Sequence, residues 1–160
     1  MYLKSYKIAL ALGGNIGNTA AFFESARKTL SAGGLQNIVC SSNYHTKPVN
    51  CPDGSADFVN AALTGVWHDS PEALHKLCQK IEINAGRPEE HGFNAPRTLD
   101  IDIIIFDDMQ LNLPNLTVPH PRFHTRTFVL EPLAEIAPDW IAPGFDLTIA
   151  QLLAQLNSAN

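Results

Sequence analysis

The sequence predicts an α+β fold in which an antiparallel sheet carries helices on one face and is followed by a C-terminal hairpin and further helices. Two observations lead to this fold class. Segments with strand patterns and segments with helical periodicity follow one another in the order βαββαβ between residues 7 and 106. Glycine, proline and asparagine gather in the connections, where they end the regular elements. This order matches the ferredoxin-like arrangement.

The first half of the chain contains the first helix and three predicted strands. Residues 7–12 are apolar on both faces, as expected of a central strand buried on both sides. Asn18 or Thr19 can cap the helix that follows, because their side-chain oxygens accept hydrogen bonds from N–H groups at a helix start. The segments 35–44 and 58–67 are rich in residues that favour strands, and a long loop joins them.

A second helix and a fourth strand complete the βαββαβ order. Ser70 precedes Pro71, so a capping residue is followed by the residue type favoured at the first helical position. The apolar stripe behind them ends near Gly86. Residues 98–106 are rich in β-branched side chains and have a period of two, which indicates a strand.

The rest of the chain, residues 107–160, predicts smaller elements. A short hairpin turns through residues 113–115, a helical segment is expected to break at Pro132, and a final helix covers residues 148–156. The sequence assigns no role to the tail after Pro143.

Composition limits the classes of protein to which the chain can belong. Its 160 residues, 45% of them hydrophobic, suffice for one core, so we expect residues 1–160 to form a single domain. The net charge of −5 argues against nucleic acid and anionic membranes as partners. The three cysteines form no C-x-x-C pair, and no apolar stretch approaches the ~20 residues of a membrane span. We therefore expect a cytoplasmic location.

Two aspartates interrupt the apolar strand at residues 98–106. Strict alternation places Asp100 and Asp102 on one face, with Ile104 and Phe106, and puts the two aspartate Cα atoms ~7 Å apart. Carboxylates at that spacing can share two hard cations with the oxygens of a polyphosphate. The alternative is an exposed strand face on which the aspartates are only solvated. Aspartate is a poor strand former, which favours a functional reason for the pair.

Arginines stand at both ends of the loop before this strand. Arg87 opens the loop, and Arg97 closes it three residues before Asp100. Arginine beside paired carboxylates is typical of phosphate recognition near bound magnesium, although solvated surface arginines are the simpler alternative. The long loops at residues 46–57 and 86–96 are predicted to act as lids over a nucleotide.

A second basic cluster lies in this acidic chain and consists of His120, Arg122, His124 and Arg126. A strip that contacts phosphate is one interpretation, and a surface or capping role is another. Zinc binding by His120 and His124 is a weaker alternative, because no cysteine or carboxylate in the segment completes a ligand set.

One amide and two aromatic rings are candidates for binding a flat ring. Asn60 lies in an apolar strand and can either hydrogen-bond the edge of a heterocycle or satisfy a buried partner. Phe58 and Phe128 can stack on a flat ring, although phenylalanine is more often part of a core. The glycine-rich turn at residues 13–17 lacks the lysine of a Walker A loop, so a bound nucleotide would depend on arginine and magnesium.

Several motifs, taken together in chain order, resemble those of one enzyme family. They are GNIG (14–17), SSNYHT (41–46), FVNA (58–61), GR (86–87), APRTLDID (95–102), VPHP (118–121) and FVL (128–130). With these motifs the chain resembles the hydroxymethyl-dihydropterin pyrophosphokinases of folate biosynthesis, from the first strand to about Asp139. The PRTLDID segment is the most specific of them.

The resemblance implies transfer of a pyrophosphoryl group from ATP, the co-substrate, to the hydroxymethyl oxygen of the dihydropterin, with release of AMP. The implied metal is magnesium, as two ions held by Asp100 and Asp102. The implied catalytic residues are Arg87, Arg97, Asp100 and Asp102. The residues implied to bind ATP are Gln79, Glu82, Arg87, Ile103, Leu116, Thr117, His120 and Arg126. Those implied to bind the pterin are Thr46, Val49, Phe58, Asn60 and Phe128.

The segment at residues 88–95 departs from the family pattern. Family members commonly carry a further arginine and an arginine–tryptophan pair, whereas this chain has Glu89, Phe93 and Asn94 there. Acidic side chains close to a triphosphate oppose its binding. One alternative therefore stays open: a paralogue that binds a pterin or nucleotide with weak or no turnover. A second is a palm-like nucleotidyltransferase, because a D-x-D strand in a ferredoxin-like fold suits that chemistry too. The expected partners are small-molecule substrates, and the expected state is a monomer or weak homodimer.

Overall fold

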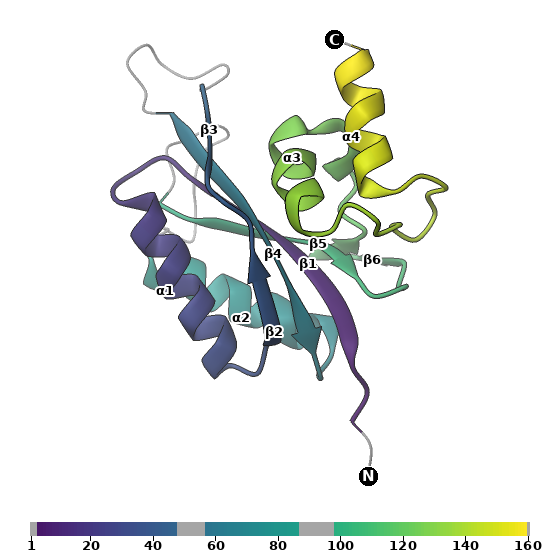
Figure 1. The fold of residues 1–160 in the computed structure, drawn as a ribbon. Coiled ribbons are helices and arrows are strands. Elements are labelled where there is room, and N and C mark those ends of the chain that lie inside the picture. The colour runs from purple at the N-terminus through teal and green to yellow at the C-terminus, as the bar shows by residue number, and fades with distance from the viewer. Residues whose placement is uncertain (1–2, 48–56, 87–97, 160) are drawn as a thin grey trace.

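Five strands form the central sheet of the computed structural model, which describes residues 3–47, 57–86 and 98–159. Four of them lie in the order β2-β4-β1-β5, and β3 pairs with β4. Their bounds are Tyr6–Gly14 for β1, Gln36–Cys40 for β2, Tyr44–Thr46 for β3, Phe58–Trp67 for β4 and Asp100–Phe106 for β5. All these pairings are antiparallel, which confirms the predicted ferredoxin-like order (Figure 1).

The central strand is β1, as its apolar run predicted. It pairs with β4 along its whole length and with β5 on its other side. Ile8 and Leu10 are fully buried in a cluster with residues of α1 (Thr19–Ala32) and α2 (Pro71–Asn84). Ala9 is fully buried in a second cluster on the opposite face. Because β1 is covered on both faces, it requires apolar side chains at successive positions.

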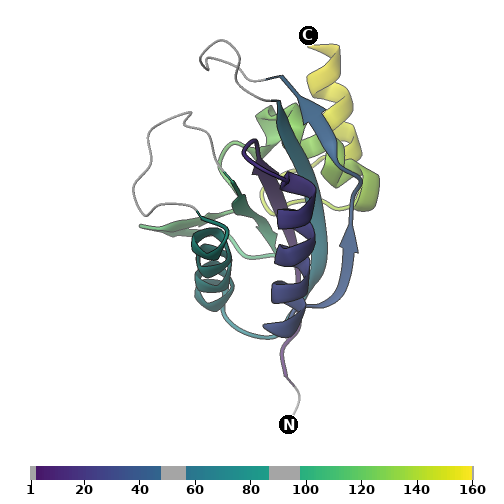
Figure 2. The ribbon, with the colours of Figure 1, turned by 90° about the vertical axis from the view of Figure 1, so that its left-hand side faces the viewer.

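The helices α1 and α2 lie side by side over one face of the sheet (Figure 2). Asn18 caps α1, since its Oδ1 accepts a hydrogen bond from the Ala21 N–H at 3.1 Å, whereas Thr19 is buried in the first turn. Ser70 caps α2, as predicted, by accepting from the Ala73 N–H at 3.1 Å. Both helices thus begin where a short polar side chain can satisfy an otherwise unpaired N–H group.

The opposite face of the sheet is covered by α3 (Thr127–Ile136) and α4 (Ile149–Ser158), as Figure 1 shows. The prediction that the helical segment breaks at Pro132 was wrong, because α3 continues through this residue. A proline at this position removes the hydrogen bond to the Phe128 carbonyl and crowds that carbonyl with its ring. Leu130 and Leu133 are buried in the second cluster, and this packing holds the helix together.

The remaining small elements agree with the prediction. The hairpin consists of β6 (Leu111–Leu113) and β7 (Leu116–Val118), and a short 3-10 helix, η1 (Phe123–Thr125), follows it. Thr148 caps α4 through a hydrogen bond from the Gln151 N–H, and this helix extends two residues beyond the predicted end. No helix in the described part of the chain has the length and apolar character that crossing a bilayer requires.

The segment predicted as one strand, residues 35–44, is divided into β2 and β3. Ser41 causes the division: its N–H donates to the Ala62 carbonyl at 2.9 Å, but its hydroxyl, instead of its carbonyl, accepts from the Ala62 N–H at 2.8 Å. A side chain therefore replaces one backbone acceptor of the ladder. The pairing with β4 resumes only at Tyr44.

A bulge in β5 corrects the predicted alternation. Ala9 pairs with Ile105 but Leu10 pairs with Ile103, so Ile104 is an extra residue. Ile104 and Ile105 both belong to the cluster under α3 and α4, whereas Phe106 belongs to the cluster under α1 and α2. The prediction that Phe106 shares a face with the aspartates was therefore wrong, and strict alternation holds only as far as Ile104.

Candidate active site

Candidate residues from three strands lie in one row across the sheet. Gly13 of β1 pairs with Asn60 of β4 on one side and with Asp100 of β5 on the other. Cross-strand partners point to the same face of a sheet, so the Asn60 and Asp100 side chains share a face. With about 4.8 Å between strands, their Cα atoms lie roughly 10 Å apart. The neighbouring row brings Asp102 to the same face, opposite Ala11.

The Asn60 amide is held in a defined position. Asn60 is only 7% exposed, and its Nδ2 donates to the Thr46 Oγ1 at 3.1 Å. Its Oδ1 lies over Gly13, where an added Cβ would come within 3.1 Å of it. The glycine therefore leaves the floor between Asn60 and Asp100 without a side chain. The structure thus brings together Asn60 and Thr46, which family resemblance assigned to the same pterin site.

The two candidate aromatic rings lie on different layers. Phe58 is half-buried on β4, directly opposite Thr46 of β3. Phe128 is 42% exposed in the first turn of α3, and the Arg126 guanidinium carbon lies 5.6 Å from the centroid of its ring. An exposed phenylalanine beside a cation offers one free face for stacking.

A cavity of about 270 Å³ lies at the outer edge of β5. It is lined by His75, Ile101, Asp102, Ile103, Pro114, Asn115, Leu116, Thr117, His120 and Pro121. Four of these residues, Ile103, Leu116, Thr117 and His120, were assigned to nucleotide binding by sequence analysis. The strand, the β6–β7 hairpin and the segment after it therefore enclose one space beside the Asp102 carboxylate.

Two hydrogen bonds hold the surroundings of this cavity against the edge of β5. The Ile101 N–H donates to the Glu82 Oε2 at 2.8 Å, and the His120 N–H donates to the Ile104 carbonyl at 2.9 Å. Glu82 is only 8% exposed, so its carboxylate completes the hydrogen bonding of an edge strand. Neither Glu82 nor Gln79, which is exposed on α2, lines the cavity.

The imidazole of His120 is arranged as a hydrogen-bond donor. Its Nδ1 accepts from the Arg122 N–H at 3.1 Å, so in the neutral ring Nε2 carries the proton. Burial lowers the pKa of His120 below its usual range; the Asp102 carboxylate opposes this, and Arg126 and Arg122 add to it. The neutral ring therefore presents an N–H group in a region that also contains two guanidinium groups.

Sequence analysis missed His75. This half-buried residue of α2 lines the cavity, where burial lowers its pKa and the Asp102 carboxylate opposes that shift. A signal was present in the sequence, because His75, Gln79 and Glu82 are spaced four and three residues apart and so form one stripe on the helix.

Several predicted residues lie outside the described ranges. They are Val49, Arg87 and Arg97, together with Glu89, Phe93 and Asn94 of the departing segment. Thr98, where the description resumes, packs against the end of β1, because an added Cβ at Gly14 would collide with its carbonyl oxygen.

Among the described residues, the candidate ligands for a metal ion are the two carboxylates of Asp100 and Asp102. No group of three or more His, Cys, Asp or Glu side chains suited to a metal comes together in the described ranges. His124 instead packs edge-on against Phe123 and lies beside Phe145. Magnesium commonly takes one or two carboxylates and completes its shell with substrate phosphates and water, so Asp100 and Asp102 fit that ion better than zinc.

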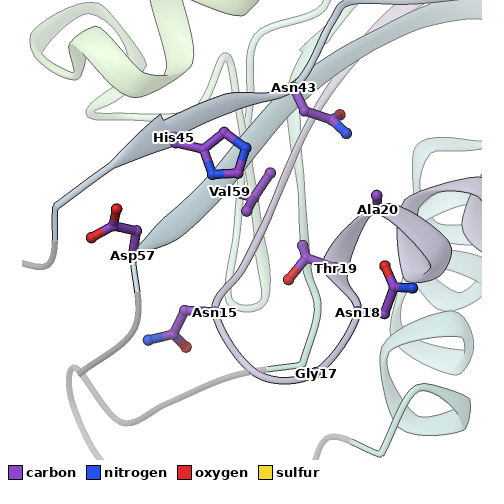
Figure 3. A pocket seen from close by; sticks show the side chains of 9 residues that line it. All are labelled: Asn15, Gly17, Asn18, Thr19, Ala20, Asn43, His45, Asp57 and Val59. Carbon is purple, nitrogen blue, oxygen red and sulfur yellow. The ribbon is translucent and has the colours of Figure 1, made fainter. Parts of the chain in front are cut away.

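A second cavity, of about 320 Å³, lies on the other face of the sheet (Figure 3). His45 and Val59 are cross-strand partners there, and they face the start of α1 at Thr19 and Ala20. None of the predicted site residues lines this cavity. The candidate site therefore comprises the row through Gly13 and the cavity at the edge of β5.

Comparison with known proteins relates this chain to one family. The family profile described as "7,8-dihydro-6-hydroxymethylpterin-pyrophosphokinase (HPPK)" matches residues 9–138. A Synechocystis protein named 2-amino-4-hydroxy-6-hydroxymethyldihydropteridine pyrophosphokinase is 39% identical over 149 residues, which cover 92% of this chain and 75% of that protein. A Bacillus subtilis protein of the same name is 39% identical over 128 residues, which cover 79% of this chain and 75% of that protein.

A solved structure has the same fold. The crystal structure of wild-type Plasmodium falciparum HPPK-DHPS with pteroate superimposes with a TM-score of 0.72 and 16% sequence identity. The match covers 99% of this chain and 43% of that one, so this chain spans less than half the length of the Plasmodium chain. At this identity the likeness concerns the fold alone.

Proposed function

The chain belongs to the 7,8-dihydro-6-hydroxymethylpterin-pyrophosphokinase family, and we propose from that premise how its residues carry out the reaction. It is an ATP-dependent pyrophosphokinase that transfers the pyrophosphoryl group of ATP to the hydroxymethyl group of 6-hydroxymethyl-7,8-dihydropterin in folate biosynthesis. The observation that carries the assignment of residues is the row from Asn60 through Gly13 to Asp100.

The pterin binds on the Asn60 side of this row. Thr46 and Asn60 hydrogen-bond the polar edge of the ring, and Phe58 and Phe128 stack on its two faces. Support comes from the Asn60–Thr46 hydrogen bond, which orients the amide, and from the exposed ring of Phe128. Val49, outside the described ranges, is assigned here by family resemblance alone.

ATP binds on the Asp100 side, in the cavity at the edge of β5. Ile103, Leu116 and Thr117 contact the nucleoside, while His120 and Arg126 bind the phosphates. Support comes from the shared lining of the cavity and from the Nε2 donor of His120. Gln79 and Glu82 stand on the same helix stripe as His75, and their assignment to ATP also follows family resemblance.

Asp100 and Asp102 are the residues that would hold magnesium, with two ions as the family resemblance implies. Both project from one face of an edge strand, and Asp102 is exposed and lines the cavity, which suits a cation shared with a substrate. When bound, magnesium would neutralise phosphate charge and fix the orientation of the polyphosphate.

The reaction forms one bond and breaks one. The hydroxymethyl oxygen of the pterin attacks the β-phosphorus of ATP and loses its proton, and the bond from that phosphorus to the α–β bridging oxygen breaks, so AMP leaves. Such transfers depend on positioning and on stabilising developing charge more than on a strong base. The roughly 10 Å between the Asn60 and Asp100 Cα atoms is suited to a ring on one side and phosphates on the other. We assign charge neutralisation to Arg87 and Arg97.

The testing experiment measures AMP formation from magnesium-ATP with and without 6-hydroxymethyl-7,8-dihydropterin. The wild type should form AMP only when the pterin is present. Asp102→Ala should lose this activity, whereas the matched control Asp108→Ala, an exposed aspartate just after β5, should keep it. Pterin binding without AMP formation would instead support the paralogue that binds without turnover. Equal activity in both variants would remove Asp102 from the site.

Family membership argues against the palm-like nucleotidyltransferase. We propose that residues 1–160 act as a single domain in the cytoplasm, as a monomer or weak homodimer whose partners are small molecules and not nucleic acid.

A further inference from the structure

Glu135, near the end of α3, accepts three hydrogen bonds from Ser42, in the connection between β2 and β3, and from Tyr44, the first residue of β3. Its Oε1 accepts from the Ser42 hydroxyl and from the Tyr44 hydroxyl, both at 2.6 Å. Its Oε2 accepts from the Ser42 N–H at 2.9 Å. One carboxylate thus joins a helix to a segment more than 90 residues earlier in the chain.

These three hydrogen bonds hold an exposed carboxylate at an electrostatically unfavourable position. Glu135 precedes the last residue of α3, where the helix dipole disfavours negative charge. The three donors offset this unfavourable interaction with the helix dipole. Hydrogen bonds to a charged acceptor are stronger than those between neutral groups. Hydrogen bonds from Ser42 and then Tyr44 hold the pKa of the Glu135 carboxyl below its usual value, and the same contact raises the pKa of Tyr44.

Glu135 connects the two layers that carry the proposed pterin site. Tyr44 pairs with Asn60, and Thr46, which accepts from Asn60, follows two residues later on the same short strand. Phe128 lies in the first turn of the same helix, α3, at the end opposite to Glu135. Strand β3 has only three residues and follows the break at Ser41, so its backbone pairing alone gives it a weak anchor.

We propose that Glu135 is a positioning residue for the pterin: its carboxylate fixes β3 against α3, so that Thr46 and Phe128 keep the spacing that the ring requires. This inference rests on the proposed pterin site and deepens it. Glu135 touches neither substrate in this assignment and acts through Ser42 and Tyr44. Its loss therefore weakens pterin binding more than ATP binding, because the nucleotide cavity lies at the opposite edge of the sheet.

Two variants weaken the hydrogen bonds of Glu135 in different ways. Glu135→Gln removes the negative charge and leaves one acceptor oxygen, so its NH₂ group can meet the Ser42 or Tyr44 hydroxyl only if that hydroxyl turns to accept. Tyr44→Phe removes one donor and leaves the carboxylate in place. Glu131→Gln is the matched control, because Glu131 is an exposed glutamate one turn earlier on α3.

The experiment measures AMP formation with the pterin varied at saturating ATP, then with ATP varied at saturating pterin. We expect Glu135→Gln to raise the KM for the pterin roughly tenfold and that for ATP less than about twofold. Tyr44→Phe should give a smaller rise, and the double variant should show less than the product of the two effects, because both remove one network. Glu131→Gln should match the wild type.

Thermal melting and calorimetric titration with 6-hydroxymethyl-7,8-dihydropterin separate the remaining outcomes. A lower melting temperature with unchanged KM values in Glu135→Gln would overturn the proposal and leave Glu135 a purely structural residue. Equal rises for both substrates would also overturn it. If the wild type bound the pterin but formed no AMP, the proposed function would fail, and a tenfold weaker binding by Glu135→Gln would still support the positioning role.

Discussion

The amide oxygen of Asn60 lies so close to Gly13 that a methyl group on this glycine would come within 3.1 Å of it. That separation is tighter than most contacts of a real Cβ, so a larger residue would displace the amide. Gly13 stands between Asn60 and Asp100 in the sheet. The backbone of β1 is therefore the floor on which the proposed pterin and magnesium sites meet.

Gly13→Ala should weaken pterin binding with little effect on ATP. The added methyl group pushes the Asn60 amide away from Thr46, and we expect the KM for the pterin to rise roughly tenfold. Steady-state AMP formation measures it. The double variant Gly13→Ala/Asn60→Ala is the control: once the amide is gone, the methyl group has nothing to displace and should add almost no further effect. If the KM for the pterin of the double variant were a further tenfold above that of Asn60→Ala alone, this explanation would be contradicted.

Magnesium dependence should change when one carboxylate of the pair is neutralised. Chelation with EDTA should stop AMP formation by the wild type, and added magnesium should restore it. Asp100→Asn should raise the magnesium concentration for half-maximal rate at least about tenfold, because one charged ligand is lost. Asp108→Asn is the control and should follow the wild-type titration. If Asp100→Asn follows it too, Asp100 does not hold the metal.

Sequence patterns predicted the strand order and the shared face of Asp100 and Asp102, because both follow from periodicity and element order. They did not predict the bulge at Ile104, since a period of two assumes an uninterrupted ladder. The prediction of a helix break at Pro132 failed for a similar reason: tertiary packing outweighs the local tendency of proline to end a helix. The Glu135 contacts could not be predicted, because Ser42 and Tyr44 meet this residue only after the sheet and α3 have packed.

Removal of the Glu82 carboxylate should destabilise the fold. Its Oε2 accepts from the Ile101 N–H, and the residue is only 8% exposed, so Glu82→Ala leaves a buried donor without this partner. We expect a loss of about 2 kcal/mol in the free energy of unfolding, measured by urea denaturation. Glu82→Gln should lose less, because its amide oxygen can still accept. A raised KM for ATP with unchanged stability would instead show that Glu82 acts on the nucleotide alone.

The half-buried His75 should make the protein less stable in mild acid. Burial lowers its pKa in the folded chain, so as the pH falls the unfolded chain, with a pKa of about 6.5, binds the proton first. The stability contributed by the neutral ring is thus present above pH ~6.5 and is lost as the pH falls through the folded pKa. The melting temperature of the wild type should therefore fall between about pH 7 and pH 5, and His75→Leu should reduce that fall.

The pKa of His120 is lowered as well, so part of the pH dependence should remain in His75→Leu. His45→Leu, which changes an exposed residue of β3, is the control. A pH dependence unchanged by His75→Leu would mean that burial of this ring does not affect its protonation.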